Sequence, residues 1–371
     1  MERRKYIFLG LSLSSAWGNG HATTFRALIK GLNALGHECI FLERNQPWFV
    51  QNRDMPNPDF CKLITYDEVE ELIRSHARLL RSADAVIIGS YVPDGVAVIA
   101  AVAALRPNVL CFYDIDTPVT LGRLDKGDSE YITAGQLQVF DIYFTFSGGK
   151  NLTRLKELGA RKAVPLYCSV DPELYCNTNE PLRWDLGYLG TYSDDRQPML
   201  EKLLVEPARQ LPEMRFVIAG AQYPDGLDLP ANIERIEHVP PNEHASFYSR
   251  QRFTLNITRR DMVRAGFSPS VRLFEAAACK TPIISDDWEG LNDFLPEDRA
   301  IVIAEDSQQV INALTAMNDE ERKALSTAAH RIVMGGHTGA ARAEHFVHAI
   351  EDELNTEEEG ANSWLLRKLP G

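Results

Sequence analysis

One stretch of the sequence places two charged side chains along an otherwise apolar helix. It reads GFSPSVRLFEAAACKTPIISDDWEGL and contains Arg272 and Glu275. Ser268 is suited to cap this helix, with Pro269 at the first helical position, where a missing N–H costs nothing. The free amides and positive dipole end at a helix start bind phosphate, and Arg272 in the first turn would add a cation. The pattern therefore predicts an anion site where this helix begins.

Glu275 is expected on the buried face of the same helix, because it lies four residues after Val271 and three before Ala278. A carboxylate in such a place needs hydrogen-bond donors, and two neighbouring ribose hydroxyls are the donors that a nucleotide offers. The alternative is a structural ion pair between Arg272 and Glu275 at the rim of a sheet. Helix periodicity alone favours neither interpretation.

A second candidate anion site is the glycine-containing turn in GYLGTYSDDRQ, with Arg196 at the head of the following helix. Such turns are often only tight connections. Arg196 and Arg272 together would nevertheless put two cations at strand ends of one sheet, which suits a diphosphate. The predicted nucleotide-binding residues are Glu275, Arg196, Arg272, Ser268, Ser270, Gly190, Thr191, Gly220 and His238.

Two carboxylates in the first half of the chain are candidates for acid–base chemistry. Asp114 and Asp116 follow an apolar strand in FYDIDTP. A carboxylate at a strand end can orient or deprotonate an attacking hydroxyl. Asp116 can equally form an Asx-type turn before Pro118. Spacing does not rank the two, so both are retained as catalytic candidates.

A glycine-containing turn near the N-terminus supplies a third catalytic candidate. His21, at the start of a helix, is either a general base or a polar cap residue. The preceding Gly18, Asn19 and Gly20 would let the backbone come close to a ligand. The turn lacks the GxGxxG spacing and an acidic partner for a dinucleotide ribose, so no nicotinamide site is predicted.

Alternating strands and helices must position these residues. Short apolar runs such as KYIFLGLS and ADAVIIGS alternate with amphipathic segments, a pattern typical of βαβ units and of parallel sheets buried on both faces. Ligands in such sheets bind at the carboxyl ends of the strands. The predicted organisation is a first α/β domain at 1–168, a linker at 169–183, a second α/β domain at 184–335, a helix at 336–355 and an acidic tail at 356–371. The helix could close either domain, and in one arrangement it crosses back to the first.

Composition narrows the class of protein. The chain has 371 residues, 44% hydrophobic and 25% charged, which suits a globular protein of two domains. Its formal charge of −13 argues against a protein that binds nucleic acid or anionic membranes through many phosphate contacts. No stretch approaches the roughly 20 apolar residues of a membrane helix. Six cysteines without a CxxC pair indicate reduced thiols in a cytoplasmic protein.

Several stretches resemble, in order, the GT-B glycosyltransferases and in particular their CgeB-like branch. They are YDIDTPVTL, SVDPELY, GYLGTYSDDRQPMLEKLL, FVIAGAQYP, LNITRRDMVRAGFSPSVRLFEAAACKTPIISDDWEGL and HTGAARAEHF. The resemblance implies two Rossmann-like domains facing across a cleft, with Glu275 on the ribose and Arg196 on a phosphate of the donor nucleotide. Two positions depart from the wider group, which has a glutamate where Phe267 stands and a glycine where Lys280 stands.

The resulting prediction is transfer of a hexosyl or related sugar from a nucleotide diphosphate sugar, by default a UDP-sugar, to an acceptor. The acceptor is a glycan, a protein or a small molecule. No metal or other cofactor is predicted to be required, and no nucleic-acid partner is expected. The alternatives are a nucleotide-sugar epimerase of similar fold and a catalytically silent binding protein of surface-layer assembly.

Overall fold

The computed structural model describes residues 2–16 and 20–366, with side chains described up to residue 356. The chain forms two compact units. The first consists of Met1–Ser169 together with Gly339–Gly371, and the second of Val170–Thr338. The last segment of the chain therefore packs with the first unit.

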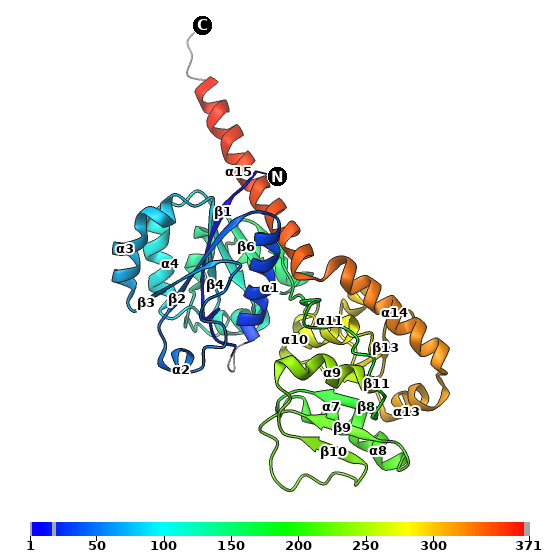
Figure 1. The fold of residues 1–371 in the computed structure, drawn as a ribbon. Helices are drawn as coiled ribbons and strands as arrows, with labels where there is room; N and C mark the ends of the chain where they lie inside the picture. The colour runs from blue at the N-terminus through cyan, green and yellow to red at the C-terminus, as the bar shows by residue number, and fades with distance from the viewer. Residues whose placement is uncertain (1, 17–19, 367–371) are drawn as a thin grey trace. The chain divides into compact units, whose positions relative to one another are not determined.

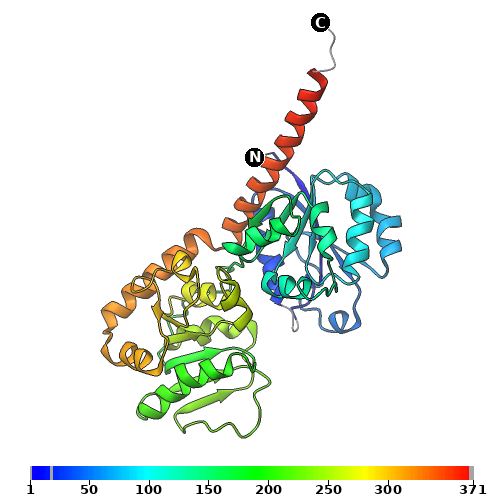
Figure 2. The same ribbon diagram turned by 180° about the vertical axis from the view of Figure 1, so that it is seen from behind.

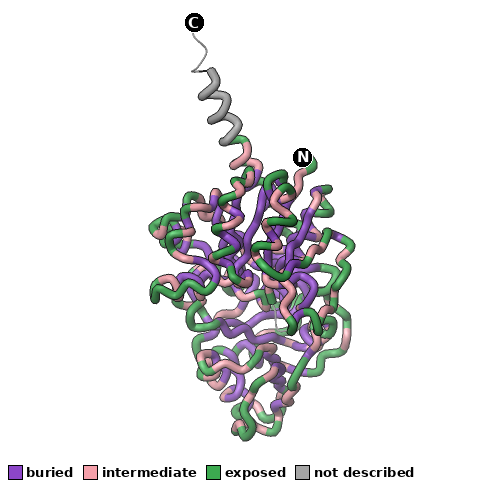
Figure 3. The backbone as a smooth tube through the Cα atoms, turned by 90° about the vertical axis from the view of Figure 1, so that its left-hand side faces the viewer, coloured by how far each residue is buried: buried purple, intermediate pink, exposed green. Residues whose placement is uncertain are grey.

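The first unit is built on a seven-stranded parallel sheet in the order β3-β2-β1-β4-β5-β6-β7. The strands are β1 Lys5–Gly10, β2 Glu38–Arg44, β3 Lys62–Tyr66, β4 Ala85–Gly89, β5 Leu110–Asp114, β6 Ile142–Thr145 and β7 Ala163–Pro165. Along β1, Tyr6 and Phe8 enter one apolar core while Ile7 and Leu9 enter another. The sheet is thus buried on both faces, as period-2 alternation in a parallel sheet requires (Figure 3).

Helices cover both faces of this sheet (Figures 1 and 2). They are α1 Gly20–Ala34, α2 Pro47–Val50, α3 Val69–Arg81, α4 Gly95–Ala104, α5 Thr117–Leu124, the 3-10 helix η1 Ala134–Val139, α6 Lys150–Glu157 and α15 Gly339–Leu366. In α3 the acidic Glu70 and Glu71 lie in the first turn and the basic Arg78 and Arg81 in the last, which complements the helix dipole. In the single turn α2, Phe49 is buried whereas Trp48 is 49% exposed.

The second unit has a six-stranded parallel sheet in the order β10-β9-β8-β11-β12-β13. Its strands are β8 Trp184–Leu189, β9 Phe216–Ala219, β10 Ile233–Ile236, β11 Gln251–Asn256, β12 Ile283–Ser285 and β13 Val302–Ile303. The central strands β8 and β11 are neighbours, with Leu255 paired to Tyr188. Because all pairs are parallel, the segments that follow β8, β9 and β11 leave from the same edge.

The helices of the second unit begin in different ways, two of them at capping boxes. They are α7 Gln197–Leu200, the π-helix η2 Glu201–Val205, α8 Glu206–Gln210, the 3-10 helix η3 Pro241–Glu243, α9 His244–Ser249, α10 Arg260–Ala265, α11 Val271–Ala278, α12 Leu291–Phe294, α13 Ser307–Ala316 and α14 Asp319–Gly336. Capping boxes start α13 at Asp306 and α14 at Asn318. Among the described residues, no helix combines the length and apolar character needed to span a membrane.

Two helix backbones touch where α15 packs on α1. A Cβ added at Gly31 would lie 2.5 Å from the carbonyl oxygen of Gly339, and one added at Gly339 would lie 2.3 Å from that of Ala27. Real Cβ atoms do not come this close, so both positions need glycine. The close approach lets α15 bury Phe346 against the sheet core that includes Phe8.

Gly339→Ala should therefore destabilise the first unit by about 1–3 kcal/mol, because the helices must separate to admit the methyl group. The matched control is Gly122→Ala in α5, where an added Cβ meets no heavy atom within 4 Å. The control should be neutral or slightly stabilising. Urea unfolding of the full chain measures both, and equal stability of the two variants would contradict the packing argument.

Candidate functional site

Arg272 joins the ends of the two central strands of the second unit. Its Nε donates to the carbonyl oxygen of Leu189 at 2.6 Å, at the end of β8. Its Nη1 donates to Oδ1 of Asn256 at 3.0 Å, at the end of β11. The guanidinium also lies over the ring of Tyr188, 5.1 Å from its centroid. The cation is thus fixed at the sheet edge where parallel α/β folds bind ligands.

The start of α11 differs from the prediction made from Ser268 and Pro269. The N-cap is Ser270, whose Oγ accepts from the backbone N of Arg272 at 3.2 Å. Ser268 is buried and donates its hydroxyl to the carbonyl of Gly266 at 2.8 Å. The predicted start was wrong because this turn engages the Ser268 hydroxyl and holds Pro269 ahead of the first helical residue.

Arg196 is a buried cation beside Arg272. Its Nη2 donates to the carbonyl of Thr191 at 2.6 Å, while its buried Nε has no hydrogen-bond partner. Burial, and then the nearby charges of Arg272 and Arg259, lower the pKa of Arg196. Within the part of the chain that the structure describes, neither Arg196 nor Arg272 forms an ion pair. A buried cation without a directly paired carboxylate is costly, so an anion bound here would be stabilising.

Glycine backbone lies directly against these cations. A Cβ on Gly190 would be 3.0 Å from Nη2 of Arg272, and one on Gly220 would be 2.0 Å from the carbonyl oxygen of Gly190. Thr191, the next residue, is exposed. The structure therefore brings Gly190, Thr191, Arg196, Gly220, Ser270 and Arg272 together at one sheet edge. His238 is exposed and follows β10, two strands away from β8 in the sheet.

Glu275 is 7% exposed and is held by tyrosines rather than by a cation. Its Oε2 accepts from the hydroxyl of Tyr248 at 3.1 Å, and the hydroxyl of Tyr175 lies nearby. Burial and the charge of Glu275 raise the pKa of both tyrosines, so both remain donors. Among the described residues, no ion pair joins Glu275 to Arg272. Val271, expected on the buried face, is exposed.

Tyr175 and Tyr248 were not predicted from the sequence as residues of this site. A signal was present, because a carboxylate placed on a buried helix face requires hydroxyl or amide donors nearby. Which tyrosines supply them depends on the fold, since Tyr248 is in α9 and Tyr175 precedes β8. The Tyr175 hydroxyl also lies 3.3 Å from Nδ1 of His244.

In the first unit, Asp114 and Asp116 lie in different environments. Asp114 ends β5 and is fully buried. It accepts from Tyr143 Oη at 2.7 Å, Thr120 Oγ1 at 2.8 Å and the backbone N of Asp116 at 3.2 Å. Burial raises the pKa of Asp114 to about 6. Asp116 is half-buried, and its Oδ2 lies 3.4 Å from the hydroxyl of Tyr91.

Tyr91 connects Asp116 with His21. The rings of Tyr91 and His21 pack edge to face with centroids 5.2 Å apart. Burial lowers the pKa of His21 to about 4, so its imidazole is neutral at neutral pH. Tyr91 has a φ of 61°, a left-handed conformation that non-glycine residues adopt at a cost. The sequence gives no signal for this residue.

The glycine turn before His21 is described only in part. Gly20 is the first residue of α1 and is exposed. Gly18 and Asn19 lie outside the described residues. The structure therefore brings His21 and Asp116 together through Tyr91, with Asp114 behind Asp116.

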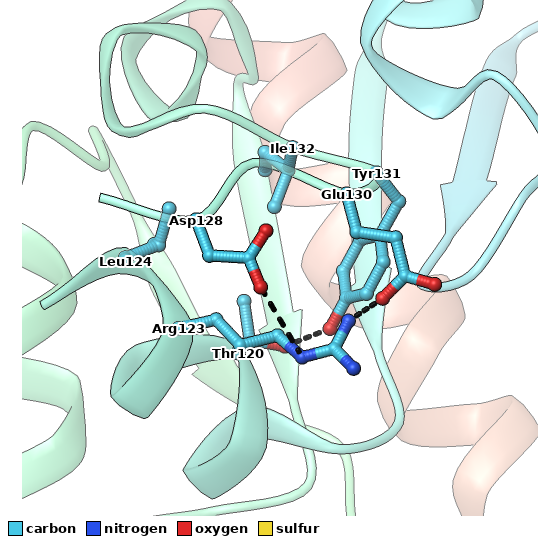
Figure 4. Close-up of a pocket in the computed structure, with 7 residues that line it drawn as sticks. All are labelled: Thr120, Arg123, Leu124, Asp128, Glu130, Tyr131 and Ile132. Atoms are coloured by element: carbon cyan, nitrogen blue, oxygen red, sulfur yellow. Dashed lines mark hydrogen bonds and ion pairs between the residues drawn. The ribbon is translucent and has the colours of Figure 1, made fainter. Parts of the chain in front are cut away.

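A small hollow of about 10 Å³ adjoins this group (Figure 4). Arg123 forms ion pairs there with Glu130 and, at 4.0 Å, with Asp128. The Arg123 guanidinium also lies over the ring of Tyr91, 5.7 Å from its centroid. These contacts compensate the acidic side chains around the hollow. Within the described residues, no group of three or more His, Cys, Asp or Glu side chains is arranged to hold a metal ion.

Comparisons with known proteins agree with this geometry. Residues 196–348 match the model of a family described as glycosyl transferase-like. An α-glucosyltransferase in complex with UDP is similar in structure, with a TM-score of 0.69 and 14% identity over 94% of this chain and 100% of that one. Sucrose-phosphate synthase from Thermosynechococcus elongatus is similar with a TM-score of 0.65 and 14% identity, over 95% of this chain and 100% of that one. Anabaena HepE in complex with UDP-glucose is similar with a TM-score of 0.64 and 12% identity, over 94% of this chain and 100% of that one.

No curated protein sequence matches the chain. The structural matches show the GT-B fold, and the predicted pair of Rossmann-like parallel sheets is confirmed. The second unit contains most of the glycosyl transferase-like domain. The chain is thus a glycosyltransferase of the GT-B fold, as the sequence predicted.

The pKa of Asp114 provides a test of its burial. The folded value of about 6 lies above the ordinary 3.8, so the folded protein holds a proton that the unfolded chain releases between these pH values. Stability from this group is full below the unfolded pKa and is lost as pH rises through the folded one. Asp114→Asn has no titrating carboxyl group at this position, so its stability does not fall in this way. The free energy of unfolding of the variant, relative to that of wild type, should therefore rise by roughly 3 kcal/mol between about pH 4 and pH 7.

Urea unfolding at a series of pH values measures this difference. Asp59→Asn is the matched control, because Asp59 is an exposed carboxylate of the same unit. Its stability relative to wild type should change little over the same range. A constant difference between Asp114→Asn and wild type would show that the fold does not raise the pKa of Asp114.

Proposed function

We propose that this glycosyltransferase binds the nucleoside diphosphate of its sugar donor at the carboxyl ends of β8, β9 and β11. The observation that carries the proposal is the pair Arg196 and Arg272, two guanidinium groups without carboxylate partners among the described residues. Gly190 puts bare backbone beside them. A diphosphate supplies the missing charge, and its charge grows as the glycosidic bond breaks, so the same cations stabilise the transition state.

Glu275 is suited to hold the ribose of that nucleotide. A carboxylate offers about four acceptor sites, and the hydroxyl of Tyr248 occupies one of them. The remaining sites accept the two vicinal ribose hydroxyls. The two tyrosines act as positioning residues, because they fix the carboxylate without touching the reacting atoms. Ser270, Thr191, Gly220 and His238 complete the proposed donor site along the same sheet edge.

In the first unit we propose Asp116 as the group that activates the acceptor hydroxyl. Asp116 is partly accessible and has a tyrosine hydroxyl within reach, whereas Asp114 is fully enclosed by donors. Asp114 then acts as a positioning residue, since it accepts from the backbone N of Asp116. His21 contributes a neutral ring that packs on Tyr91. The turn containing Gly18, Asn19 and Gly20 is proposed to approach both substrates.

The finer assignment follows from the sequence. The stretches around Arg196, Glu275 and Asp116 support placement in the CgeB-like branch and transfer of a hexosyl or related sugar. UDP is the proposed nucleotide, because similar structures are described in complex with UDP or UDP-glucose. The acceptor is not assigned.

Nucleotide-induced stabilisation tests the donor site. In thermal unfolding with UDP, GDP, ADP, TDP and CDP, UDP at about 100 times its Kd should add roughly 2.7 kcal/mol to the stability. Glu275→Ala and Arg196→Gln should each remove most of this gain. Arg215→Gln, an exposed arginine just before β9 at the opposite edge, should retain it. Equal gains in all four proteins would reject the site.

Substitutions at Asp116 test the proposed base. Asp116→Asn should lower the transfer rate at least about 100-fold, the range expected for loss of general acid–base catalysis, while the Kd for UDP stays unchanged. Tyr91→Phe, which loses only the hydroxyl near Asp116, should lower the rate less. Asp59→Asn, an exposed carboxylate of the same unit, should retain the wild-type rate. Transfer by Asp116→Asn at the wild-type rate would exclude this residue as the base.

A further inference from the structure

The second unit contains a cavity of about 350 Å³ beside the C-terminal end of α11. Its size falls within the range of small-molecule sites. Pro172, Tyr175, Cys176, Asn177, Asn179, Ala278, Lys280, His330 and Met334 line it. We call it the α11–α14 cavity, because Ala278 ends α11 and His330 and Met334 lie on α14.

The charged lining of the α11–α14 cavity is basic. Lys280 brings an ammonium group, His330 brings an imidazole, and the lining contains no carboxylate. Among the described residues, Lys280 takes part in no ion pair. The protein as a whole has a formal charge of −13, whereas the lining of this cavity has a lysine ammonium and no carboxylate. The electrostatics of the cavity therefore favour an anionic ligand.

The backbone at Lys280 supports a role for its side chain. Lys280 follows the last turn of α11 with a φ of 56°, a left-handed conformation in which glycine is the usual residue. A lysine in this conformation is strained. Such strain is commonly kept where the side chain is used. Glycine would remove the strain but also the ammonium group.

Polar residues tie the cavity wall to α11. His330 Nδ1 lies 3.1 Å from the carbonyl oxygen of Ala278, so this nitrogen carries the proton. Asn177 donates its Nδ2 to the carbonyl of Cys279 at 3.0 Å. Both contacts are to the end of the helix that carries Glu275. Movement of the wall is thereby coupled to α11.

Tyr175 links the α11–α14 cavity to the proposed donor site. It lines the cavity, and its hydroxyl lies close enough to Glu275 for the carboxylate charge to act on it. We propose that the cavity binds a small organic anion, a phosphate monoester or a carboxylate, and that the bound anion tightens nucleotide binding by holding Tyr175 on Glu275. The second half of this proposal rests on the proposed function of Glu275. A ligand that orders Tyr175 pays part of the entropy that the nucleotide otherwise pays.

Alkylation of Cys176 tests binding in the cavity. Cys176 is exposed and lines the cavity, so an anion bound there should slow its modification by iodoacetamide. The probes are inorganic phosphate, glycerol 3-phosphate and succinate, compared with chloride at equal ionic strength. They separate phosphate from carboxylate ligands. The modified cysteine is identified by peptide mass spectrometry of the full chain.

In the wild type, at least one probe should slow the alkylation of Cys176 several-fold. Lys280→Gly should abolish the protection, and it is expected to fold well because glycine suits the left-handed φ. Lys202→Ala is the matched control, because Lys202 is an exposed lysine of the same unit outside the cavity. This control should keep the protection. Equal alkylation rates with chloride and with all three probes would overturn the proposed site.

Calorimetric titration with UDP tests the coupling. The protecting anion should lower the Kd for UDP at least about fivefold in the wild type, within the usual range of coupling between sites. Tyr175→Phe should keep the Cys176 protection and lose the effect on UDP. Unchanged or weaker UDP binding with the anion present would overturn the coupling. Failure of UDP to bind at all, with Cys176 still protected, would instead reject the donor site and leave the cavity supported.

Discussion

The proposed donor site of this protein depends on how Arg272 is held. Its guanidinium donates to the ends of two neighbouring strands, β8 and β11, and lies over Tyr188. These contacts satisfy its hydrogen bonds but not its charge. Arg196 beside it is buried, donates to one backbone carbonyl, and likewise has no carboxylate partner among the described residues. The sheet edge therefore fixes two guanidinium groups that form no ion pair within the described residues, which suits a preorganised diphosphate site.

Buried carboxylates in both units are stabilised by hydroxyl and amide donors rather than mainly by cations. Glu275 is held by tyrosines and Asp114 by Tyr143, Thr120 and a backbone amide. Glu43 is also fully buried and accepts from the backbone amides of two residues that precede the glycine turn. Hydroxyl and amide donors fix a carboxylate without neutralising it. The cations of the donor site are thus left available for a ligand.

The α11 helix carries or leads to three charged residues of the second unit. Its first turn carries Arg272, its middle carries Glu275, and its last turn leads to Lys280. Each of these charged groups faces a different structural environment, namely strand ends, tyrosine hydroxyls and a cavity. A short rigid helix with such contacts can transmit a movement from one of these environments to another, because its ends move together.

The sequence by itself determined the two parallel α/β sheets, the strand ends that carry Arg196 and Asp116, and the class of glycosyltransferase. The sheets and the strand ends follow from local periodicity. The glycosyltransferase class follows from the resemblance of several stretches to the GT-B glycosyltransferases. It did not separate an ion pair from a hydroxyl-held carboxylate at Glu275, nor Asp114 from Asp116, and it misplaced the N-cap by two residues. Only the tertiary structure decided the environments of these carboxylates, because Tyr248, Tyr91 and Tyr143 reach them from other elements of the fold. Burial and hydrogen-bond partners are properties of packing between distant segments, and no local pattern encodes them.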